Sequence, residues 1–170
     1  DYRIIGTLNT SDKHYLFELS DALKSRFAHV EIEIPSKKEK DQEIFFALKN
    51  AAQEIEYDFE DYFQLDETKK SIIKKDENFF NAIDSCYNIL SLVRIFKGFG
   101  TAILKLIYQN ILGGVVTNMK YYNSVDYERL VDLSIVSNIL PLIENLTKTD
   151  LEIVNSLVNK TTIQFIEKIH

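Results

Sequence analysis

The sequence predicts a mainly α-helical fold with a short strand–helix–strand segment at its N-terminal end. Glycine (5 residues) and proline (2 residues) are scarce among the 170 residues, which favours long helices over a turn-rich β protein. From Ser36 onward, apolar residues recur three or four positions apart, the period of an amphipathic helix. The segment before Pro35 contains short apolar runs with β-branched residues, which are typical of strands. We therefore predict two domains, residues 1–35 and 36–170.

The first domain is expected to present a polar side chain at the tip of a strand. A buried strand is predicted over Tyr2–Leu8, and Asn9 follows it directly. A polar loop then leads to a short helix, Leu19–Arg26, and to a second strand, Ala28–Ile34, which ends at Pro35. In open α/β sheets, ligands bind beyond the carboxyl ends of strands. Asn9 is thus placed where a ligand-contacting group is expected.

The second domain is predicted to contain five or six helices. The segment Ser36-Lys37-Lys38-Glu39 has the spacing of a capping box and should begin the first one. Its apolar face would consist of Ile44, Phe45, Leu48, Ala52, Ile55 and Phe59. We expect its acidic end, residues 54–61, to be exposed to solvent, and residues 64–75 to form a surface loop or a short helix.

Asp76 is predicted to cap the second long helix, which breaks at Gly98–Thr101. Its buried stripe would consist of Phe79, Phe80, Ile83, Tyr87, Leu90 and Val93. A third helix should begin at Thr101 and end at Gly113–Gly114, because glycine tolerates the left-handed backbone of helix ends. Its apolar residues are Ile103, Leu106, Ile107 and Ile111.

A linker through residues 121–123 is expected to precede a fourth helix, which Ser124 would cap and Pro141 would break or kink. Its apolar stripe would include Leu130, Leu133, Val136, Ile139 and Leu140. Two short helices, Leu151–Val158 and Ile163–Ile169, are predicted to open at Thr149–Asp150 and Thr161–Thr162.

Composition narrows the class of protein. A net charge of −6 argues against sequence-independent binding of nucleic acid by this chain, since such binding depends on neutralising phosphates. The single cysteine, Cys86, cannot form an internal disulfide, and its apolar helical surroundings predict a buried structural thiol. No signal peptide is visible, and the apolar region Ile89–Met119 is interrupted by charged residues. We expect a cytoplasmic protein.

Two blocks of sequence resemble the second half of the AAA+ core in the McrB-like restriction NTPases. They are Ile5–Lys13, IGTLNTSDK, and Leu19–Phe27, LSDALKSRF. The later Ile139-Leu140-Pro141 is similar to the end of a helix in the same family. The resemblance implies that Asn9 is sensor 1, which orients the attacking water, and that Arg26 is an arginine finger presented to a neighbouring subunit. Lys13 and Lys24-Ser25 depart from the arginines of the family pattern.

The resemblance further implies that residues 36–170 are the helical lid over the nucleotide. Asp12, Lys13 and Thr101 are then expected to lie near the nucleotide. Sensor 2 is left unassigned, with Arg94 and Lys97 as the nearest basic residues. The intact protein would use ATP or GTP with magnesium in a homo-oligomeric ring, pair with a McrC-like nuclease and act on DNA indirectly, without a membrane.

The 170 residues contain no glycine-rich phosphate loop ending in Gly-Lys-Ser/Thr and no apolar strand ending in paired acidic residues. The step Gly98-Phe99-Gly100-Thr101 lacks the lysine and follows a helix. We therefore expect the chain to be the C-terminal part of a longer protein, inactive alone and without a cofactor of its own. The three histidines are not at ligand spacing, so no metal site is predicted.

Other interpretations of these residues stay open. Asn9 alone is also typical of a turn cap, and Arg26 alone of a cation at a helix C-terminus. One alternative function is a non-catalytic helical interaction module that docks a partner through its Phe- and Tyr-rich faces. Another is a MoxR-like or dynein-related chaperone ATPase, because these proteins share the sensor 1 and arginine–phenylalanine pattern.

Overall fold

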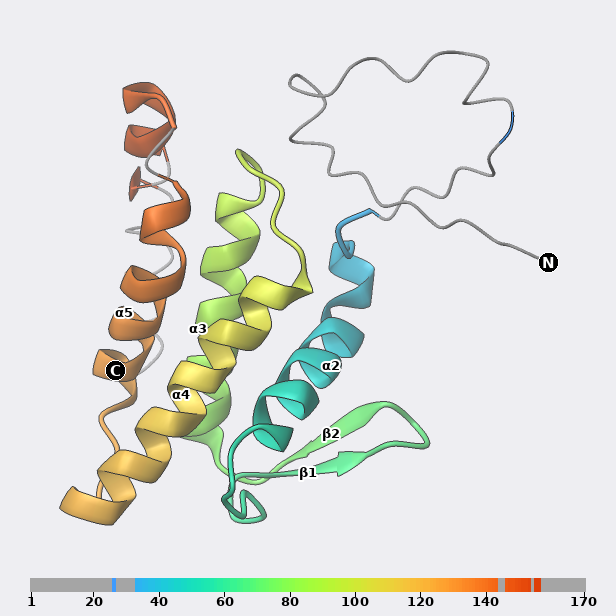
Figure 1. Ribbon diagram of the computed structural model, residues 1–170, viewed down its shortest axis with the longest axis vertical. Coiled ribbons are helices and arrows are strands. Elements are labelled where there is room, and N and C mark those ends of the chain that lie inside the picture. Colours follow the sequence, from blue (N-terminus) through green and yellow to red (C-terminus); the bar gives the residue numbers. More distant parts are fainter. Residues whose placement is uncertain (1–25, 27–32, 144–145, 154, 157–170) are drawn as a thin grey trace. The chain divides into compact units, whose positions relative to one another are not determined.

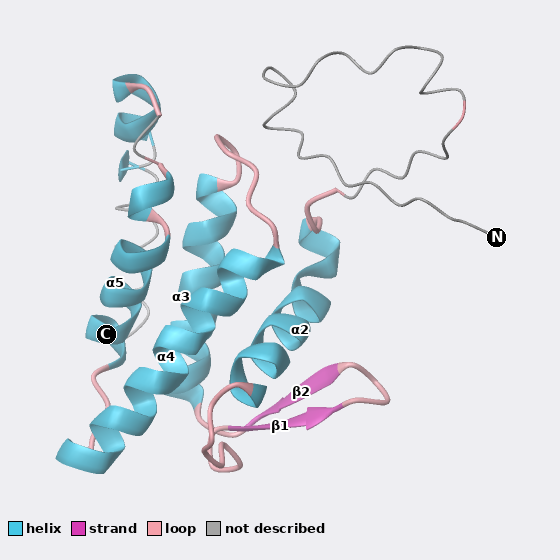
Figure 2. Cartoon of the chain, viewed as in Figure 1, coloured by secondary structure: helices cyan, strands magenta, loops and turns pink. Residues whose placement is uncertain are grey.

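The computed structural model of the chain describes residue 26 and residues 33–143, 146–153, 155 and 156 (Figure 1). The chain divides into two units, residues 1–33 and 34–170. The second unit is mainly helical and carries one two-stranded antiparallel sheet (Figure 2), so the predicted helical class is confirmed. The predicted strand Tyr2–Leu8 lies outside the described residues, and so does the predicted helix Leu19–Arg26 except for Arg26, which lies in a turn. Glu33 and Ile34, assigned to the second strand, have an irregular backbone.

The first long helix, α2 (Lys40–Gln53), is preceded by one 3-10 turn, η2 (Lys37–Glu39). The predicted capping residues fix where this turn begins. The Glu39 carboxylate accepts hydrogen bonds from the backbone N–H of Ser36 (2.8 Å) and from its hydroxyl (2.9 Å). These contacts satisfy a backbone donor that the helix itself leaves unpaired.

Helix α2 ends at Gln53, so the prediction that it continues through residues 54–61 is wrong. The backbone turns instead: Tyr57 N–H donates to the Ile55 carbonyl (2.9 Å), and Glu60 N–H donates to the Asp58 carboxylate (2.9 Å). An aspartate that binds the backbone two residues on favours a turn over a helix. Phe59 still reaches the core from this loop and is buried.

Residues 64–75, predicted as a loop or a short helix, form most of a β-hairpin instead. Strand β1 (Phe63–Asp66) pairs antiparallel with β2 (Ser71–Lys74), in a register that places Leu65 opposite Ile72. The connecting turn passes through Lys70 in the left-handed region, at φ 51°. Ile72 and Ile73 provide the β-branched strand propensity, which the surrounding lysines obscured in the sequence.

Helix α3 (Glu77–Val93) begins where predicted and buries the predicted residues, but it ends at Val93, before the predicted break at Gly98–Thr101. The Asp76 carboxylate accepts a hydrogen bond from Phe79 N–H (2.9 Å) and caps the helix. The whole predicted stripe is buried, namely Phe79, Phe80, Ile83, Tyr87, Leu90 and Val93. Phe79 stacks on Phe63 with ring centroids 5.6 Å apart, which joins α3 to the hairpin.

Helix α4 (Thr101–Tyr122) begins at Thr101, as predicted, but its predicted end at Gly113–Gly114 is wrong. The helix continues to Tyr122, and Asn123 ends it in the left-handed region, at φ 53°. A Cβ atom at Gly114 would overlap the Leu130 side chain, whose Cγ lies 3.2 Å from that position. Gly114 is therefore a packing contact between helices and not a helix end.

Helix α5 (Tyr127–Asn138) is capped by Asp126 and not by Ser124. The Asp126 carboxylate accepts a hydrogen bond from Arg129 N–H (3.1 Å). Helix α5 contacts α3 and α4, and its buried line runs through Leu130 and Ser134. The predicted burial is therefore right for Leu130 and Ile139 and wrong for Leu133, Val136 and Leu140, each more than half exposed.

The break at Pro141 is confirmed, because α5 gives way to a 3-10 turn, η3 (Leu140–Leu142). Helical residues resume at 148, earlier than the predicted Leu151. Thr147 opens this segment: its hydroxyl donates to the Asp150 carboxylate (2.6 Å) and accepts from Asp150 N–H (3.2 Å). The last predicted helix, Ile163–Ile169, lies outside the described residues.

The core is built mainly from α2, α3 and α4, with the hairpin and α5 packed around them (Figure 1). Its large, fully enclosed side chains include Tyr108, Phe45, Phe79, Leu48, Ile83 and Leu90. Among the described residues, every buried polar side-chain atom has a hydrogen-bond partner. No described helix is both long and apolar enough to cross a membrane.

Candidate functional site

The described structure contains two of the five residues to which the sequence assigned a role. Asn9, Asp12 and Lys13 lie outside the described residues. Arg26 belongs to the first unit, where it is an exposed turn residue. Thr101 belongs to the second unit and is the first residue of α4. The assigned roles of all five residues stay predictions.

Thr101 contacts Glu43, the one acidic or basic residue among the fully buried residues of the described chain. The Thr101 hydroxyl donates a hydrogen bond to Oε1 of Glu43 (3.0 Å). Glu43 projects from the first turn of α2, and its side chain is only 1% exposed. A carboxylate this deeply buried is stable only when charge and hydrogen bonds compensate for the lost water.

Arg94 provides this compensation. Its Nη1 donates to Oε2 of Glu43 (2.9 Å) and its Nη2 donates to Oε1 (2.6 Å), so the ion pair is bidentate. The Arg94 side chain is 8% exposed. Its third nitrogen, Nε, donates to the Phe99 carbonyl (2.8 Å). We call Glu43, Arg94, the Phe99 carbonyl and Thr101 the Glu43 network.

The Glu43 network joins three elements that are distant in the sequence. Glu43 lies in α2, Arg94 directly follows α3, and Thr101 opens α4. The loop between α3 and α4 has a second attachment, because Nζ of Lys97 donates to the Leu142 carbonyl in η3 (2.8 Å). The network thus fixes how α4 begins relative to α2 and α3.

The chemistry of this arrangement favours positioning over catalysis. The Glu43 carboxylate accepts three hydrogen bonds, and each guanidinium nitrogen of Arg94 donates one. Charged hydrogen bonds of this bidentate kind are strong and directional. Glu43 is therefore a poor general base in this conformation, and Arg94 is already committed to an anion within the protein.

Glu43 was not predicted as a site residue, although its position in the sequence indicates that it is buried. Glu43 is four residues before Ala47 and eight before Ala51, so it lies on the apolar side of α2. Arg94 likewise continues the line of Tyr87 and Leu90 on α3. One acidic and one basic residue, each on a buried helix face, predict a buried pair.

The remaining unusual titratable groups are structural. Cys86 is fully buried, as predicted, and burial raises the pKa of its thiol to about 12. Burial, followed by the Asp76 carboxylate, raises the pKa of Tyr127, whose hydroxyl donates to Asp76 (3.3 Å). In the described part of the chain, no group of three or more His, Cys, Asp or Glu side chains could hold a metal ion.

The chain was compared with protein-family models, curated proteins and solved structures, and none of them matches it.

Proposed function

We propose that the chain is the C-terminal part of an AAA+ NTPase similar to the McrB-like group. Residues 1–35 would form the edge of the α/β core and residues 36–170 the helical lid. The intact protein would hydrolyse ATP or GTP with magnesium in a homo-oligomeric ring. It would power a McrC-like nuclease partner and act on DNA through that partner.

One observation supports this proposal: two sequence blocks that resemble the AAA+ sensor 1 and arginine-finger segments precede a mainly helical unit along the chain. The blocks Ile5–Lys13 and Leu19–Phe27 end only a few residues before Pro35. The mainly helical unit follows at once, with η2 beginning at Lys37. A lid that directly follows the arginine-finger segment has this order in AAA+ proteins.

The proposed chemistry is divided between Asn9 and Arg26. The Asn9 amide would orient the attacking water beside the γ-phosphate. The Arg26 guanidinium would neutralise charge that develops on the transferring phosphoryl group of the neighbouring subunit, an effect worth ~10³–10⁵ in rate for arginine fingers. The ligands of the magnesium ion and the phosphate-binding loop would come from residues outside this chain.

In this proposal, the Glu43 network is a mechanical part of the lid. It links α2, the end of α3 and the start of α4 through charged hydrogen bonds. Three helices joined in this way would move together when the lid opens or closes over a nucleotide. Glu43 and Arg94 are then positioning residues that do not touch the nucleotide.

The deciding experiment substitutes Arg26 in the full-length protein that contains this chain. Arg26→Ala should lower kcat by ~10³ or more and leave the nucleotide Kd within about threefold. Arg26→Lys should remain defective, because lysine lacks the planar fork of arginine. Arg129→Ala, which removes an exposed arginine on α5, is the matched control and should leave kcat unchanged.

A finger that acts between subunits makes a further prediction. Wild-type subunits mixed with an excess of Arg26→Ala subunits should lose turnover more steeply than simple dilution explains. Equal loss of nucleotide binding and turnover would instead identify Arg26 as a structural residue. Unchanged turnover in Arg26→Ala would remove the finger altogether.

The alternatives are separated by sequence outside this chain. A phosphate loop and an acidic strand end within ~150 residues before Asp1 would favour an NTPase over a non-catalytic interaction module. A neighbouring gene for a nuclease would favour a restriction motor over a MoxR-like or dynein-related chaperone ATPase.

A further inference from the structure

A cavity of about 310 Å³ lies between α2, β2 and α3. None of the residues predicted to lie near a nucleotide lines it. Its floor is apolar and consists of Ile44, Phe80 and Ile83, all buried. Ile72 and Lys74, which share one face of β2, line its other side together with Ser71 and the turn residue Lys70. We call this space the β2 cavity. Its volume is at the lower end of the ~300–1,000 Å³ of small-molecule sites, which suits a few side chains better than a cofactor.

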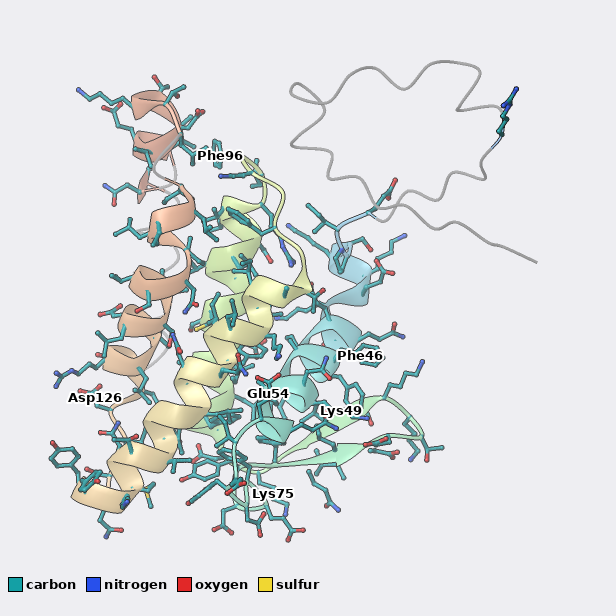
Figure 3. All side chains as sticks on the ribbon, viewed as in Figure 1. Phe46, Lys49, Glu54, Lys75, Phe96 and Asp126 are labelled. Atoms are coloured by element: carbon teal, nitrogen blue, oxygen red, sulfur yellow. The ribbon has the colours of Figure 1, made fainter. Side chains whose placement is uncertain are left out.

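Basic side chains surround this apolar floor. The ammonium groups of Lys70, Lys74 and Lys40 lie over the rings of Phe46, Phe80 and Tyr87, at 5.7, 5.0 and 5.1 Å from the ring centroids. Figure 3 shows Phe46 on the side of α2 that faces the hairpin. Cation–π contacts hold a lysine in place without neutralising its charge.

The cavity lining contains two lysines, Lys70 and Lys74, and two aspartates, Asp41 and Asp84, and Lys40 lies beside it over the Tyr87 ring. Asp84 pairs with Lys40 (2.8 Å) and with Lys74 (3.5 Å), and Asp41 also lines the space. Residues 63–75 contain four lysines, at positions 69, 70, 74 and 75, against two acidic residues, Asp66 and Glu67. Lys69 lies 3.9 Å from Asp66, and Lys49 of α2 lies 2.8 Å from Glu67. The hairpin is thus a basic region on a chain whose net charge is −6. This local charge favours an acidic partner.

The second strand also offers an unpaired edge. Lys75 N–H donates to the Tyr62 carbonyl (3.1 Å), which sets the phase of the antiparallel ladder. By the alternation of such ladders, Ile73 exchanges its hydrogen bonds with β1, and Ile72 and Lys74 direct their backbone N–H and C=O groups away from β1. The sheet has two strands, and no described residue pairs with this outer edge. An open edge can accept one more strand.

We propose that the β2 cavity and the outer edge of β2 form a docking site for an acidic, extended peptide segment of a partner protein. The peptide backbone pairs with Ile72 and Lys74, as in β-strand addition. One large apolar side chain of the peptide enters the cavity over Ile44, Phe80 and Ile83. Its flanking carboxylates contact Lys40, Lys70 and Lys74.

The combination of features selects a peptide over other anions. A phosphodiester chain would use the lysines, but it has no backbone donors and acceptors for the edge of β2 and no large alkyl group for the cavity floor. An acidic peptide with one apolar residue uses all three features. This proposal does not depend on the proposed NTPase activity.

The test uses the full chain and a fluorescein-labelled heptapeptide, Asp-Glu-Val-Phe-Val-Glu-Asp, with binding followed by fluorescence anisotropy at low salt. The peptide should bind, and replacing its central Phe by Ser should weaken binding by about tenfold, as expected for loss of a buried apolar side chain. In ¹⁵N NMR spectra, the amides of Ile72 and Lys74 should shift and exchange with solvent more slowly when the peptide is bound.

The double variant Lys70→Glu/Lys74→Glu should weaken peptide binding at least ~10-fold, because two attractions become repulsions. The matched control is Lys37→Glu/Lys38→Glu, which makes the same charge change at two exposed lysines of η2 and should leave binding within about twofold. Circular dichroism confirms that both variants are folded.

Three results would overturn the proposal. The first is absence of peptide binding at millimolar concentration. The second is equal affinity for the peptides with Phe and with Ser, which would leave only a non-specific charge effect. The third is tighter binding of a 20-base-pair DNA duplex than of the peptide, with the same dependence on Lys70 and Lys74, which would identify a phosphate site.

Discussion

Replacing Arg94 by Ala should be among the most destabilising single substitutions in the described fold. The change removes both hydrogen bonds of the bidentate pair and leaves Glu43, 1% exposed, with only the Thr101 hydroxyl. Breaking a buried pair by removing one partner costs about 3–5 kcal/mol, because the remaining charge is buried without compensation. A domain is stable by only ~5–15 kcal/mol in total, so the loss is a large share.

The measurement is urea unfolding followed by far-ultraviolet circular dichroism, since the chain contains no tryptophan. In a thermal melt followed by the same signal, Tm should fall by ~6–20 °C, at ~2–4 °C per kcal/mol for a chain of this size. The double variant Glu43→Leu/Arg94→Met removes both charges and should be more stable than Arg94→Ala. Arg129→Ala should change the free energy of unfolding by less than ~0.5 kcal/mol.

A cost below ~1 kcal/mol for Arg94→Ala would contradict this account, because an unpaired carboxylate buried to this extent should destabilise the fold by more. So would a double variant as unstable as the two single losses added together, since the ion pair would then show no coupling.

Three further substitutions test the packing, in urea titrations of the same kind. Gly114→Ala should destabilise the fold by ~1–2 kcal/mol, because the added Cβ overlaps Leu130. Gly113→Ala should stabilise it by ~0.5–1 kcal/mol, because a Cβ there meets nothing within 4 Å. Equal effects at both positions would contradict the close contact between Gly114 and Leu130. Asp76→Ala should cost ~1–2 kcal/mol, because the carboxylate caps α3 and also accepts the Tyr127 hydroxyl; a loss no larger than that of Asp126→Ala would show that the second bond contributes nothing. Burial raises the pKa of the Cys86 thiol from 9.0 to about 12, so the unfolded chain loses this proton first as pH rises. Between pH 9 and pH 12 the free energy of unfolding should therefore fall by up to ~1.4 kcal/mol per pH unit. Cys86→Ala should remove this share of the pH dependence, and an unchanged slope would refute the assignment to Cys86.

Features determined by neighbouring residues were predictable from the sequence. Helix α3 is the clearest case: Asp76 supplies its cap, and every predicted residue from Phe79 to Val93 is buried. The break at Gly98–Thr101 and the 3-10 turn around Pro141 follow from the same local chemistry. Each of these predictions needs only the period of the helix and the conformational limits of a few residue types.

Features determined by distant residues were not predictable in this way. Gly113 and Gly114 are typical of a helix end, yet α4 continues because Gly114 lets Leu130 of α5 pack against it. Helix α5 shows the same limit: its sequence contains an apolar stripe through Leu133 and Val136, but contacts with α3 and α4 bury the line of Leu130 and Ser134 instead. Tertiary packing outweighs the local pattern in both cases.

The Glu43 network contains one residue chosen from the sequence, Thr101, and a pairing that the sequence did not reveal. Thr101 was chosen because of a family resemblance, and the structure surrounds it with Glu43 and Arg94, which the resemblance did not single out as a pair. The pairing joins residues 51 positions apart, so the spacing within either helix could not reveal it. Only the burial of a charge on each helix face indicated that a partner was required.

The hydrogen bond of the Thr101 hydroxyl bears on whether Thr101 could bind a phosphate in the proposed NTPase. Thr101 has one O–H group to donate, and Glu43 accepts it. A phosphate oxygen is an acceptor, so in this conformation the Thr101 hydroxyl could offer it only lone pairs, which repel an anion. To donate to a phosphate, Thr101 would have to leave Glu43 with one hydrogen bond fewer inside the core, which costs ~1–3 kcal/mol. The proposed nucleotide chemistry therefore depends on Asn9 and Arg26, and Thr101 serves it by holding the start of α4 in place.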